Sequence, residues 1–467
     1  MKVQSVNPST GKLIKEFEAA SADEVNNAVA EARAAQAGWS ALSLGEKAVY
    51  FERLAKILQD NAQEILALMK EETGKRIPDG EAEVYDVIDA INYYIGQMRK
   101  VHPDKSLKLN PEAFPDTDLE IEYVPYGVIG LIMPWNFPFY SPGMFVIAAL
   151  VAGNAVVLKP SEFSTLVALD MQSRFKEAGF PEGIFEVLIG AEDTGKLLVK
   201  SDVDKIFFVG SVEAGQDIIA NAGIKPIQVE LGGNSAALVL EDADIDLATK
   251  GVSWAGTYHA GQDCVGIKRV FVVESVADEF ISKLTSVVST LRPGIDYGPY
   301  ITSEALETVR QRIEDSVTKG AKLLCGGKKI KAPEGDGFWL TPSVLIYTDD
   351  NLELVTKETF GNTVPVMVVK NAEEAVEKAN HTVYGLSNAV FTKDLQKAER
   401  IALLLQSGMV FINEPFIAIP GWDHWTGWKN SGFGTAESKI MQCLKKKVIS
   451  VNKSGAARSF WYPYPEK

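Results

Sequence analysis

The chain has 467 residues, of which 46% are hydrophobic and 23% charged, and its formal net charge at pH 7 is −15. This length allows two or three domains, each with its own core. The acidic balance argues against nucleic acid or an anionic membrane surface as a partner. The cysteines Cys264, Cys325 and Cys443 form neither a disulfide framework nor a C-x-x-C pair, and the first residues lack the apolar core of a signal peptide. We therefore predict a reducing, cytoplasmic setting and no metal site.

The first quarter of the chain is predicted to be helical. Ser21–Ala37 opens with a capping serine and an acidic first turn, and Leu44–Glu72 carries apolar residues at helical spacing. A further helix is predicted over Asp79–Lys100. Residues 123–158 then contain no charged side chain, which is long enough for a membrane span. Prolines interrupt this segment, so we predict a buried strand, loop and helix there instead.

The middle of the chain alternates between predicted strands and helices with short connections. This alternation is typical of a parallel, doubly wound α/β sheet, and it occurs in two blocks. The first block has strands at 127–133, 155–158, 185–189 and 205–209 and helices at 143–152, 164–176 and 212–222. The second has strands at 235–240, 269–273, 321–324, 343–346 and 364–369 and helices at 246–257, 276–291 and 306–319. Segments 107–123 and 447–464 fit neither block, and we predict strands that pair with each other or with another subunit.

Two motifs suggest a nucleotide site, although no G-x-G-x-x-G fingerprint follows a strand. Lys159 and Glu162 directly follow a predicted strand, where a lysine and a carboxylate can bind ribose hydroxyls. Phe208–Gly215 runs from a strand through a glycine turn into a helix, whose N-terminus favours phosphate. Taken alone, the second motif is more often an ordinary tight turn between a strand and a helix.

Cys264 lies in the stretch HAGQDCVGIKRV. A lone cysteine is usually a small buried hydrophobic residue. However, Gly261 and Gly266 leave room for a ligand or for close backbone approach, and the cysteine N–H is available to a developing oxyanion. Lys268 and Arg269 would lower the pKa of a nearby thiol. Both interpretations, buried residue and nucleophile, stay open at this point.

Three other residues are candidates to act with Cys264. His259 precedes the cysteine by five residues, which is not the usual arrangement of a thiol hydrolase, so we assign it a structural role. Glu230 ends an apolar strand before a double glycine, where catalytic groups of α/β sheets lie, although pairing with a lysine is an alternative. Asn136 lies in the loop Met133–Pro138 and serves either a turn or a bound ligand.

Taken together, the motifs resemble the NAD(P)-dependent aldehyde dehydrogenase superfamily. The resemblance extends from Asn7–Gly11 to Gly427–Gly434 and rests on the order of Pro134–Pro138, Lys159–Glu162, Glu230–Gly233 and Gly261–Cys264. It implies an α/β fold with a Rossmann-type cofactor domain, an α/β catalytic domain and a small β extension for assembly into a homodimer or homotetramer. The corresponding boundaries are 1–106 and 124–231 for the cofactor domain, 232–436 for the catalytic domain, and 107–123 and 437–467 for the oligomerisation strands.

The resemblance also implies the reaction, in which an aldehyde is oxidised to a carboxylic acid through a thioester on Cys264. Asn136 and the cysteine N–H hold the oxyanion, and Glu230 activates the hydrolytic water. The cofactor is NAD, with NADP as the alternative, because Glu162 repels a 2′-phosphate whereas Lys159 offsets that repulsion. The residues implied to bind it are Trp135, Lys159, Glu162, Gly195, Gly210, Ser211, Leu231, Glu358 and Phe360.

The substrate is predicted from the residues that match the entrance of the site. These are Phe137, Tyr140, Met144, Asp263 and Val265, with Phe416 or Trp422 from a late loop. This set contains no arginine to bind a substrate carboxylate, so we predict an apolar aliphatic or aromatic aldehyde. The alternatives are a succinate semialdehyde dehydrogenase and a CoA-acylating enzyme, the second disfavoured by a water-activating glutamate; a cofactor-free cysteine hydrolase and a catalytically silent protein are more distant.

The chain also departs from the family pattern in three places. Asn362 stands where the family has a proline, which we expect to loosen the nicotinamide loop. Thr426 replaces the first glycine of a Gly-Gly pair, and residues 292–299 are shorter than the common pattern. None of these positions coincides with Cys264 or Glu230, so we expect them to affect substrate choice rather than reaction type.

Overall fold

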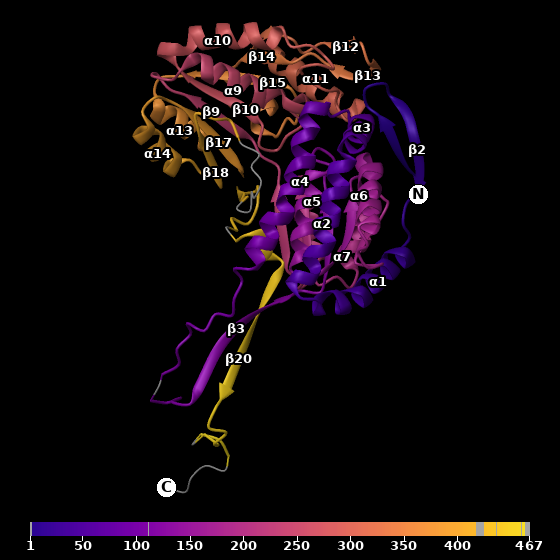
Figure 1. Cartoon of the computed structure of the whole chain (residues 1–467). Coiled ribbons are helices and arrows are strands. Elements are labelled where there is room, and N and C mark those ends of the chain that lie inside the picture. The colour runs from indigo at the N-terminus through magenta and orange to yellow at the C-terminus, as the bar shows by residue number, and fades with distance from the viewer. Residues whose placement is uncertain (1, 111, 417–424, 436, 459, 463–467) are drawn as a thin grey trace.

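Two α/β bodies and a projecting two-stranded ribbon make up the chain in a computed structural model (Figure 1). The structure describes residues 2–110, 112–416, 425–435, 437–458 and 460–462. The chain begins with an antiparallel hairpin, β1 (Lys2–Asn7) and β2 (Lys12–Glu18), which the sequence analysis did not predict. No helix among the described residues is long and apolar enough to cross a membrane.

Four helices follow the hairpin, as predicted for this part of the chain. They are α1 (Ala22–Ala41), α2 (Leu44–Asp60), α3 (Ala62–Thr73) and α4 (Ile77–Met98). The capping serine predicted before α1 forms a complete capping box, because Ser21 and Glu24 each bond the other's backbone N–H. The helix predicted over Leu44–Glu72 is divided into two at Asn61.

The first body contains a parallel sheet of five strands in the order β6-β5-β4-β7-β8. The uncharged segment supplies β4, which is buried along its whole length. The strands are β4 (Val128–Met133), β5 (Ala155–Pro160), β6 (Phe185–Val187), β7 (Lys205–Gly210) and β8 (Ile227–Leu231), with helices α5 (Tyr140–Val151), α6 (Thr165–Glu177), α7 (Glu192–Lys200) and α8 (Val212–Asn221) and the short η1 (Glu162–Ser164).

The second body contains a seven-stranded sheet in the order β11-β14-β15-β10-β9-β17-β18, which is parallel except for the edge strand β11. Its strands are β9 (Ser235–Val239), β10 (Ile267–Val273), β11 (Lys322–Cys325), β14 (Ser343–Ile346), β15 (Thr363–Val369), β17 (Ser387–Phe391) and β18 (Met409–Ile412). The helices are α9 (Ile245–Thr257), α10 (Glu274–Ser289), α11 (Ser303–Thr318), α13 (Ala372–Asn380) and α14 (Leu395–Leu404).

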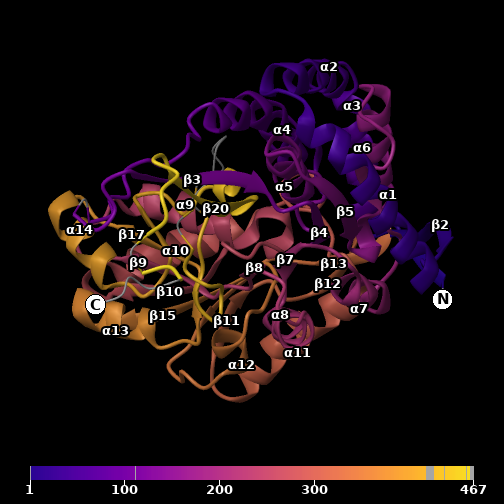
Figure 2. The same cartoon turned by 90° about the horizontal axis from the view of Figure 1, so that it is seen from below.

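Short elements complete the second body. They are η2 (Tyr258–Gly261), β12 (Lys329–Ala332), β13 (Gly335–Leu340), α12 (Glu353–Thr356), β16 (Tyr384–Gly385), β19 (Trp428–Lys429) and α15 (Lys439–Gln442). The chain passes from the first sheet to the second within three residues, between Leu231 at the end of β8 and Ser235 at the start of β9. Figure 1 shows the labelled strands of the second body above the helices of the first body, and Figure 2 shows the same elements from below.

The ribbon consists of β3 (Thr117–Pro125) and β20 (Leu444–Asn452), which run antiparallel and project away from both bodies (Figure 1). The predicted pairing of the two outlying segments with each other is therefore confirmed. The first predicted strand is shorter than expected, because β3 begins at Thr117 rather than at residue 107. Before β3, Asp104 forms an isolated bridge with Ile121. The predicted domain boundaries at 106, 231 and 436 stay a prediction.

Candidate active site

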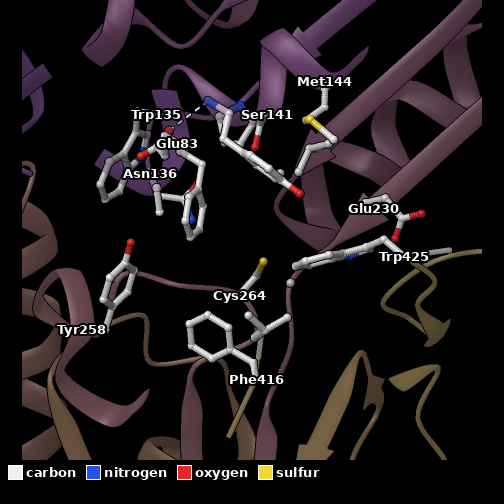
Figure 3. Close-up of a pocket in the computed structure, with 18 of the residues that line it drawn as sticks. Glu83, Trp135, Asn136, Ser141, Met144, Glu230, Tyr258, Cys264, Phe416 and Trp425 are labelled. Carbon is white, nitrogen blue, oxygen red and sulfur yellow. Dashed lines mark hydrogen bonds between the residues drawn. The ribbon is translucent and has the colours of Figure 1, made fainter. Parts of the chain in front are cut away.

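A cavity of about 700 Å³ lies where segments from both bodies meet. The loop between β4 and α5, the end of β8, the Cys264 loop and the loop after α12 all contribute to its wall (Figure 3). The structure brings most of the predicted site residues to this one cavity. They are Trp135, Asn136, Phe137, Tyr140, Met144, Gly210, Ser211, Glu230, Leu231, Cys264, Val265, Glu358, Phe360 and Phe416.

Cys264 follows η2 in a loop of unusual backbone conformation. His259, Ala260 and Gly261 have φ angles of 46°, 56° and 71°, which lie in the left-handed region. A Cβ at Gly261 would stand 2.1 Å from the carbonyl oxygen of Gly361. The glycine therefore makes room for a neighbouring backbone segment rather than for substrate, so only the backbone half of the prediction holds for Gly261.

Buried hydrogen bonds hold this loop in place. The Gln262 amide donates to the carbonyl oxygens of His259 and Pro299 at 3.0 and 3.1 Å and accepts from the N–H of Ile301 at 2.9 Å. Lys268 Nζ donates to the Gly261 carbonyl at 2.6 Å. With its backbone bonded from several sides, the loop presents Cys264 in one orientation, and Figure 3 shows Sγ pointing into the cavity.

The electrostatic surroundings of Cys264 differ from the sequence-based expectation. Burial, followed by the charges of Asp263 and Glu358, raises the pKa of the Cys264 thiol well above its usual value, and Lys268 opposes this shift. Arg269 takes no part, because its guanidinium donates to the carbonyl oxygens of Asn234, Lys378 and Ala379. The uncharged thiol is therefore the resting form, and a nearby group must accept its proton before it can act as a nucleophile.

Asn136 lies beside the cysteine loop. Its side chain is 4% exposed, and Nδ2 donates to the backbone carbonyl of Gln262 at 3.1 Å. This bond fixes the amide two residues from the nucleophile, with the loop between β4 and α5 as its support. The sequence-based pairing of Asn136 with Cys264 thus corresponds to spatial neighbours in one cavity.

Glu230 enters the cavity from the end of β8. Its Oε1 accepts a hydrogen bond from Gln228 Nε2 at 3.1 Å, and its Oε2 is buried without a described partner. Burial raises the pKa of Glu230 to about 8, against the opposing effects of the Gln228 bond, the charge of Lys439 and the backbone N–H of Gly427. Sequence reasoning missed Gln228, although its spacing of two residues on one strand places both side chains on the same face.

Glu358 and Phe360 form another wall of the cavity. Glu358 Oε1 accepts from the N–H of Gly233 at 3.1 Å, and burial raises the pKa of its carboxyl to about 7. Phe360, with a φ of 48°, contacts Trp135 edge to face at 5.8 Å between ring centroids. Glu358 thus lies at the passage between the two sheets, and Phe360 lies against the loop between β4 and α5.

Asn362 does not loosen this loop, contrary to the expectation. Its Oδ1 accepts from the Tyr300 hydroxyl at 2.6 Å, its N–H donates to the same hydroxyl at 3.1 Å, and Nδ2 donates to the carbonyl of Leu340 at 3.1 Å. The side chain is 1% exposed. Buried hydrogen bonds replace the rigidity that a proline would supply.

The remaining predicted cofactor residues lie near the carboxyl ends of β5 and β7. Lys159 Nζ lies 3.8 Å from Oε2 of Glu162. A Cβ added at Gly195 would lie 3.9 Å from Lys159 Cδ. Ser211 caps α8 by accepting from the N–H of Ala214. These groups fit a dinucleotide, since a helix N-terminus favours a pyrophosphate and the partly exposed Glu162 carboxylate can accept from ribose hydroxyls.

Aromatic rings form much of the predicted substrate end. Phe137 contacts Tyr140 at 6.3 Å and stacks with Tyr258 at 6.4 Å, while Trp254 stacks with Phe416 at 4.8 Å between centroids. Trp254 and Tyr258 were not predicted, because helical position alone does not indicate which ring faces a cavity formed between two bodies.

Two substrate predictions have a different outcome. Asp263 is fully buried and does not line the cavity; its Oδ1 accepts from the N–H of Val265 at 3.1 Å. Its carboxylate is therefore turned back onto its own loop, away from the predicted position. Trp422 lies outside the described residues.

His259 matches the structural role that the sequence analysis assigned to it. The ring is fully buried, contacts Trp135 at 5.9 Å and has no described hydrogen-bond partner at either nitrogen. Burial, assisted by the charges of Lys75 and Arg76, lowers the pKa of His259 well below its usual value. The His259 ring is thus buried and uncharged, and it does not line the cavity.

Comparison with known proteins identifies the family to which this site belongs. The model of the aldehyde dehydrogenase family matches residues 1–449. The chain belongs to the aldehyde dehydrogenase family. It is 32% identical to a betaine aldehyde dehydrogenase of Bacillus subtilis (strain 168), over 93% of this chain and 90% of that protein. It is 34% identical to a mitochondrial succinate-semialdehyde dehydrogenase of Arabidopsis thaliana, over 93% of this chain and 82% of that protein.

Solved structures agree with this assignment. A crystal structure of betaine aldehyde dehydrogenase from Staphylococcus aureus in complex with NAD+ has a TM-score of 0.93 at 28% identity, covering 99% of this chain and 94% of that one. The predicted family, the α/β fold and the enzyme class are therefore confirmed. The chain is an aldehyde dehydrogenase that uses NAD(P).

Proposed function

We propose that the enzyme oxidises an aldehyde to a carboxylic acid through a thioester on Cys264. The observation that carries the proposal is that Cys264, Asn136 and Glu230 line one cavity. A thiol, an amide donor and a carboxylate are the three groups that covalent aldehyde oxidation needs as nucleophile, oxyanion donor and base.

In the first step the sulfur of Cys264 forms a bond to the aldehyde carbon. The thiol proton is lost before or during this attack, and we assign Glu230, whose Oε2 has no side-chain partner among the described residues, as its acceptor through water. The negative charge on the former carbonyl oxygen is stabilised by Nδ2 of Asn136 and by the cysteine N–H. Bound NAD(P)+ supplies the acceptor for the hydride that leaves this carbon, so that a thioester remains.

In the second step Glu230, which has released the thiol proton to solvent, accepts a proton from water, and the oxygen of that water attacks the thioester carbon. The carbon–sulfur bond then breaks, the carboxylic acid is released, and the sulfur of Cys264 regains a proton. The raised pKa of about 8 supports this role, because a base of that strength can both take and return a proton near neutral pH. A water-activating base argues against transfer of the acyl group to coenzyme A.

The cofactor would be held by residues in two groups. The first group lines the shared cavity and comprises Glu358, Phe360, Trp135 and Leu231, together with Gly210 and Ser211 at the start of α8. Lys159, Glu162 and Gly195 would hold the adenosine end. The partly exposed carboxylate of Glu162 favours NAD over NADP, because a carboxylate repels a 2′-phosphate.

The cavity wall supports an aldehyde without a negative charge. Arg76 lines the cavity, which the sequence analysis did not predict, but its guanidinium is bonded to both carboxylate oxygens of Asp79 and to the carbonyl of Ile295. No free arginine therefore faces the cavity among the described residues. We propose that hexanal and benzaldehyde are better substrates than succinate semialdehyde, and the three kcat/KM values test this order.

Replacing Cys264 with serine tests the reaction itself. We expect the Cys264→Ser variant to produce no NADH from aldehyde and NAD+, whereas Cys325→Ser, which changes a cysteine outside the cavity, keeps wild-type turnover. Unchanged oxidation in Cys264→Ser would refute the mechanism, and product analysis with and without coenzyme A excludes or reveals acyl transfer.

We also propose a homo-oligomer, a dimer or tetramer, that is assembled through the β3–β20 ribbon. A two-stranded ribbon is marginally stable in water on its own. This ribbon projects from the body and exposes Val448 and Val451 by 62% and 48% (Figure 1). Burial of these side chains against another subunit supports both the stability of the ribbon and the assembly.

A further inference from the structure

Asp86 is the least compensated charge in the wall of the cavity. It lies on α4, is 9% exposed, and has no hydrogen bond or ion pair with any residue that the structure describes. Burial, together with the charges of Asp89 and Glu83, raises the pKa of Asp86 to about 6. A mostly buried carboxylate without a partner is rare, because its desolvation is not repaid by any protein group.

Each of the other carboxylates in the wall accepts at least one hydrogen bond from a described residue. Asp79 is bonded to Arg76, and Glu83 to Lys75 and to the N–H groups of Phe139 and Tyr140. Glu230 and Glu358 accept from Gln228 and from the N–H of Gly233. Asp86 is thus the exception in this cavity wall, and its missing partner is a group that the described residues do not provide.

The surroundings of Asp86 favour a cation. Asp86 and Tyr140 both line the cavity, and burial, followed by the charge of Asp86, raises the pKa of Tyr140. The Tyr140 ring continues through Phe137 and Tyr258 to Phe416 by ring contacts. Aromatic faces attract positive charge, and they do so more strongly where water is excluded. Lys75 Nζ already lies 4.0 Å from the ring centroid of Phe137 and 5.9 Å from that of Tyr258.

The two basic residues of the wall do not compete for Asp86. The Arg76 guanidinium donates to the Asp79 carboxylate and to the Ile295 carbonyl. Nζ of Lys439 lies 5.5 Å from the ring centroid of Phe145. Because neither pairs with Asp86, the negative charge stays available to a bound molecule. The cavity therefore offers one free anion, aromatic faces and a nucleophilic cysteine.

We propose that the preferred aldehyde carries a positively charged nitrogen at the end away from its carbonyl group, and that Asp86 and the neighbouring aromatic rings bind this nitrogen. The inference rests on the proposed function, since it assumes that the aldehyde carbon reaches Cys264. It sharpens the predicted apolar aldehyde into an aliphatic chain that ends in an ammonium group. Asp86 then acts as a specificity-determining residue for the charged end.

Two pairs of aldehydes that differ only in charge test the proposal. The compound 4-(trimethylammonio)butanal is compared with 5,5-dimethylhexanal, and 3-aminopropanal with butanal, at saturating NAD+ and pH 8. We expect at least a tenfold higher kcat/KM for the charged member of one or both pairs. The pair with the larger ratio distinguishes binding by the aromatic faces, which suits the quaternary ammonium, from a hydrogen bond to the carboxylate, which suits the primary one.

Variants on α4 assign the preference to Asp86. In Asp86→Asn the charged-to-neutral ratio should fall about tenfold, and Asp86→Lys should shift the preference towards succinate semialdehyde. Asp89→Asn removes the same charge from an exposed position one turn away, outside the cavity wall, and should leave the ratio within twofold. Both aldehydes of a pair are tested on the same preparation of each variant. A smaller fraction of folded enzyme then lowers both kcat/KM values equally and leaves their ratio unchanged.

Two results would overturn the inference. One is the absence of any preference for the charged aldehydes in the wild-type enzyme, and the other is a ratio that Asp86→Asn and Asp89→Asn change equally. In either case oxidation of hexanal dependent on Cys264 would still support the proposed reaction. If no aldehyde at all is oxidised, the proposed function itself is wrong.

Discussion

The side-chain amide of Gln228 donates a hydrogen bond to Oε1 of Glu230 at 3.1 Å, two residues along the same strand. The amide oxygen of Gln228 in turn accepts from the hydroxyl of Thr435 at 3.1 Å. This second bond fixes which end of the amide faces the carboxylate. Gln228 is therefore a positioning residue, which holds one oxygen of Glu230 and leaves the other for water.

Removing this amide should shift the pH dependence of thioester hydrolysis. Glu230 acts as a base only when it has lost its proton, so hydrolysis rises with pH through the pKa of about 8. The Gln228 bond favours the charged form, so its loss raises that pKa further and moves the rise to higher pH. For Gln228→Leu we expect a shift of roughly half to one pH unit, from a hydrogen bond worth about 1 kcal/mol.

The shift is measured as the rate of acyl-enzyme decay after a single turnover, from pH 6 to pH 10. Gln172→Leu serves as the control, because Gln172 also bonds a glutamate, Glu186, but lies outside the cavity. A profile that Gln228→Leu leaves unchanged would show that the amide does not tune the base.

Glu230→Gln should separate the two halves of the reaction. Without the base, the thioester forms but is hydrolysed slowly, since general-base catalysis contributes about 10²–10⁴-fold. At high pH, where the thiol ionises without help, we expect one equivalent of NADH per active site and then little further turnover. Mass spectrometry should detect the acyl group on Cys264. Steady turnover without a burst would contradict the assignment of Glu230 to hydrolysis.

The motifs identified correctly which segments meet at the cavity, but not how each side chain in them is turned. Cys264 and Asp263 are adjacent in the sequence, yet the first points into the cavity and the second bonds its own loop. The same loop has a left-handed backbone at His259 and Ala260, which no local sequence pattern predicts.

Residues contributed by helices were harder to predict. Asp86 and Trp254 face the cavity only because the two bodies pack together as they do, and amphipathic spacing identifies a buried face without saying what it meets. The fold was more accessible, because uninterrupted apolar strands such as β4 and capped helices such as α1 carry local signals. Strands β17 and β18 were missed, although β17 is as deeply buried as β9.

Asn362 should contribute to both stability and cofactor binding. Asn362→Ala removes the side-chain donor to the buried Leu340 carbonyl and the acceptor of the Tyr300 hydroxyl proton, while the backbone bond to that hydroxyl remains, and the loss costs about 1–3 kcal/mol of unfolding free energy. The loop that carries Glu358 and Phe360 should then move more, so the KM for NAD+ rises several-fold. Urea denaturation and initial rates measure the two effects. The control Asn351→Ala changes an exposed asparagine bonded to Asp349 and should alter neither; an equal effect of both variants would contradict the role of Asn362.

The ribbon should determine the oligomeric state. Lysines in place of Val448 and Val451 would put two charges into the proposed subunit interface, where charge is strongly disfavoured. We expect the double variant to sediment as a smaller assembly than the wild-type homo-oligomer in analytical ultracentrifugation. Leu403→Lys changes another exposed apolar side chain, 89% exposed on α14, and should leave the assembly intact. A wild-type enzyme that sediments as a monomer, or a double variant with wild-type mass, would contradict assembly through β3 and β20.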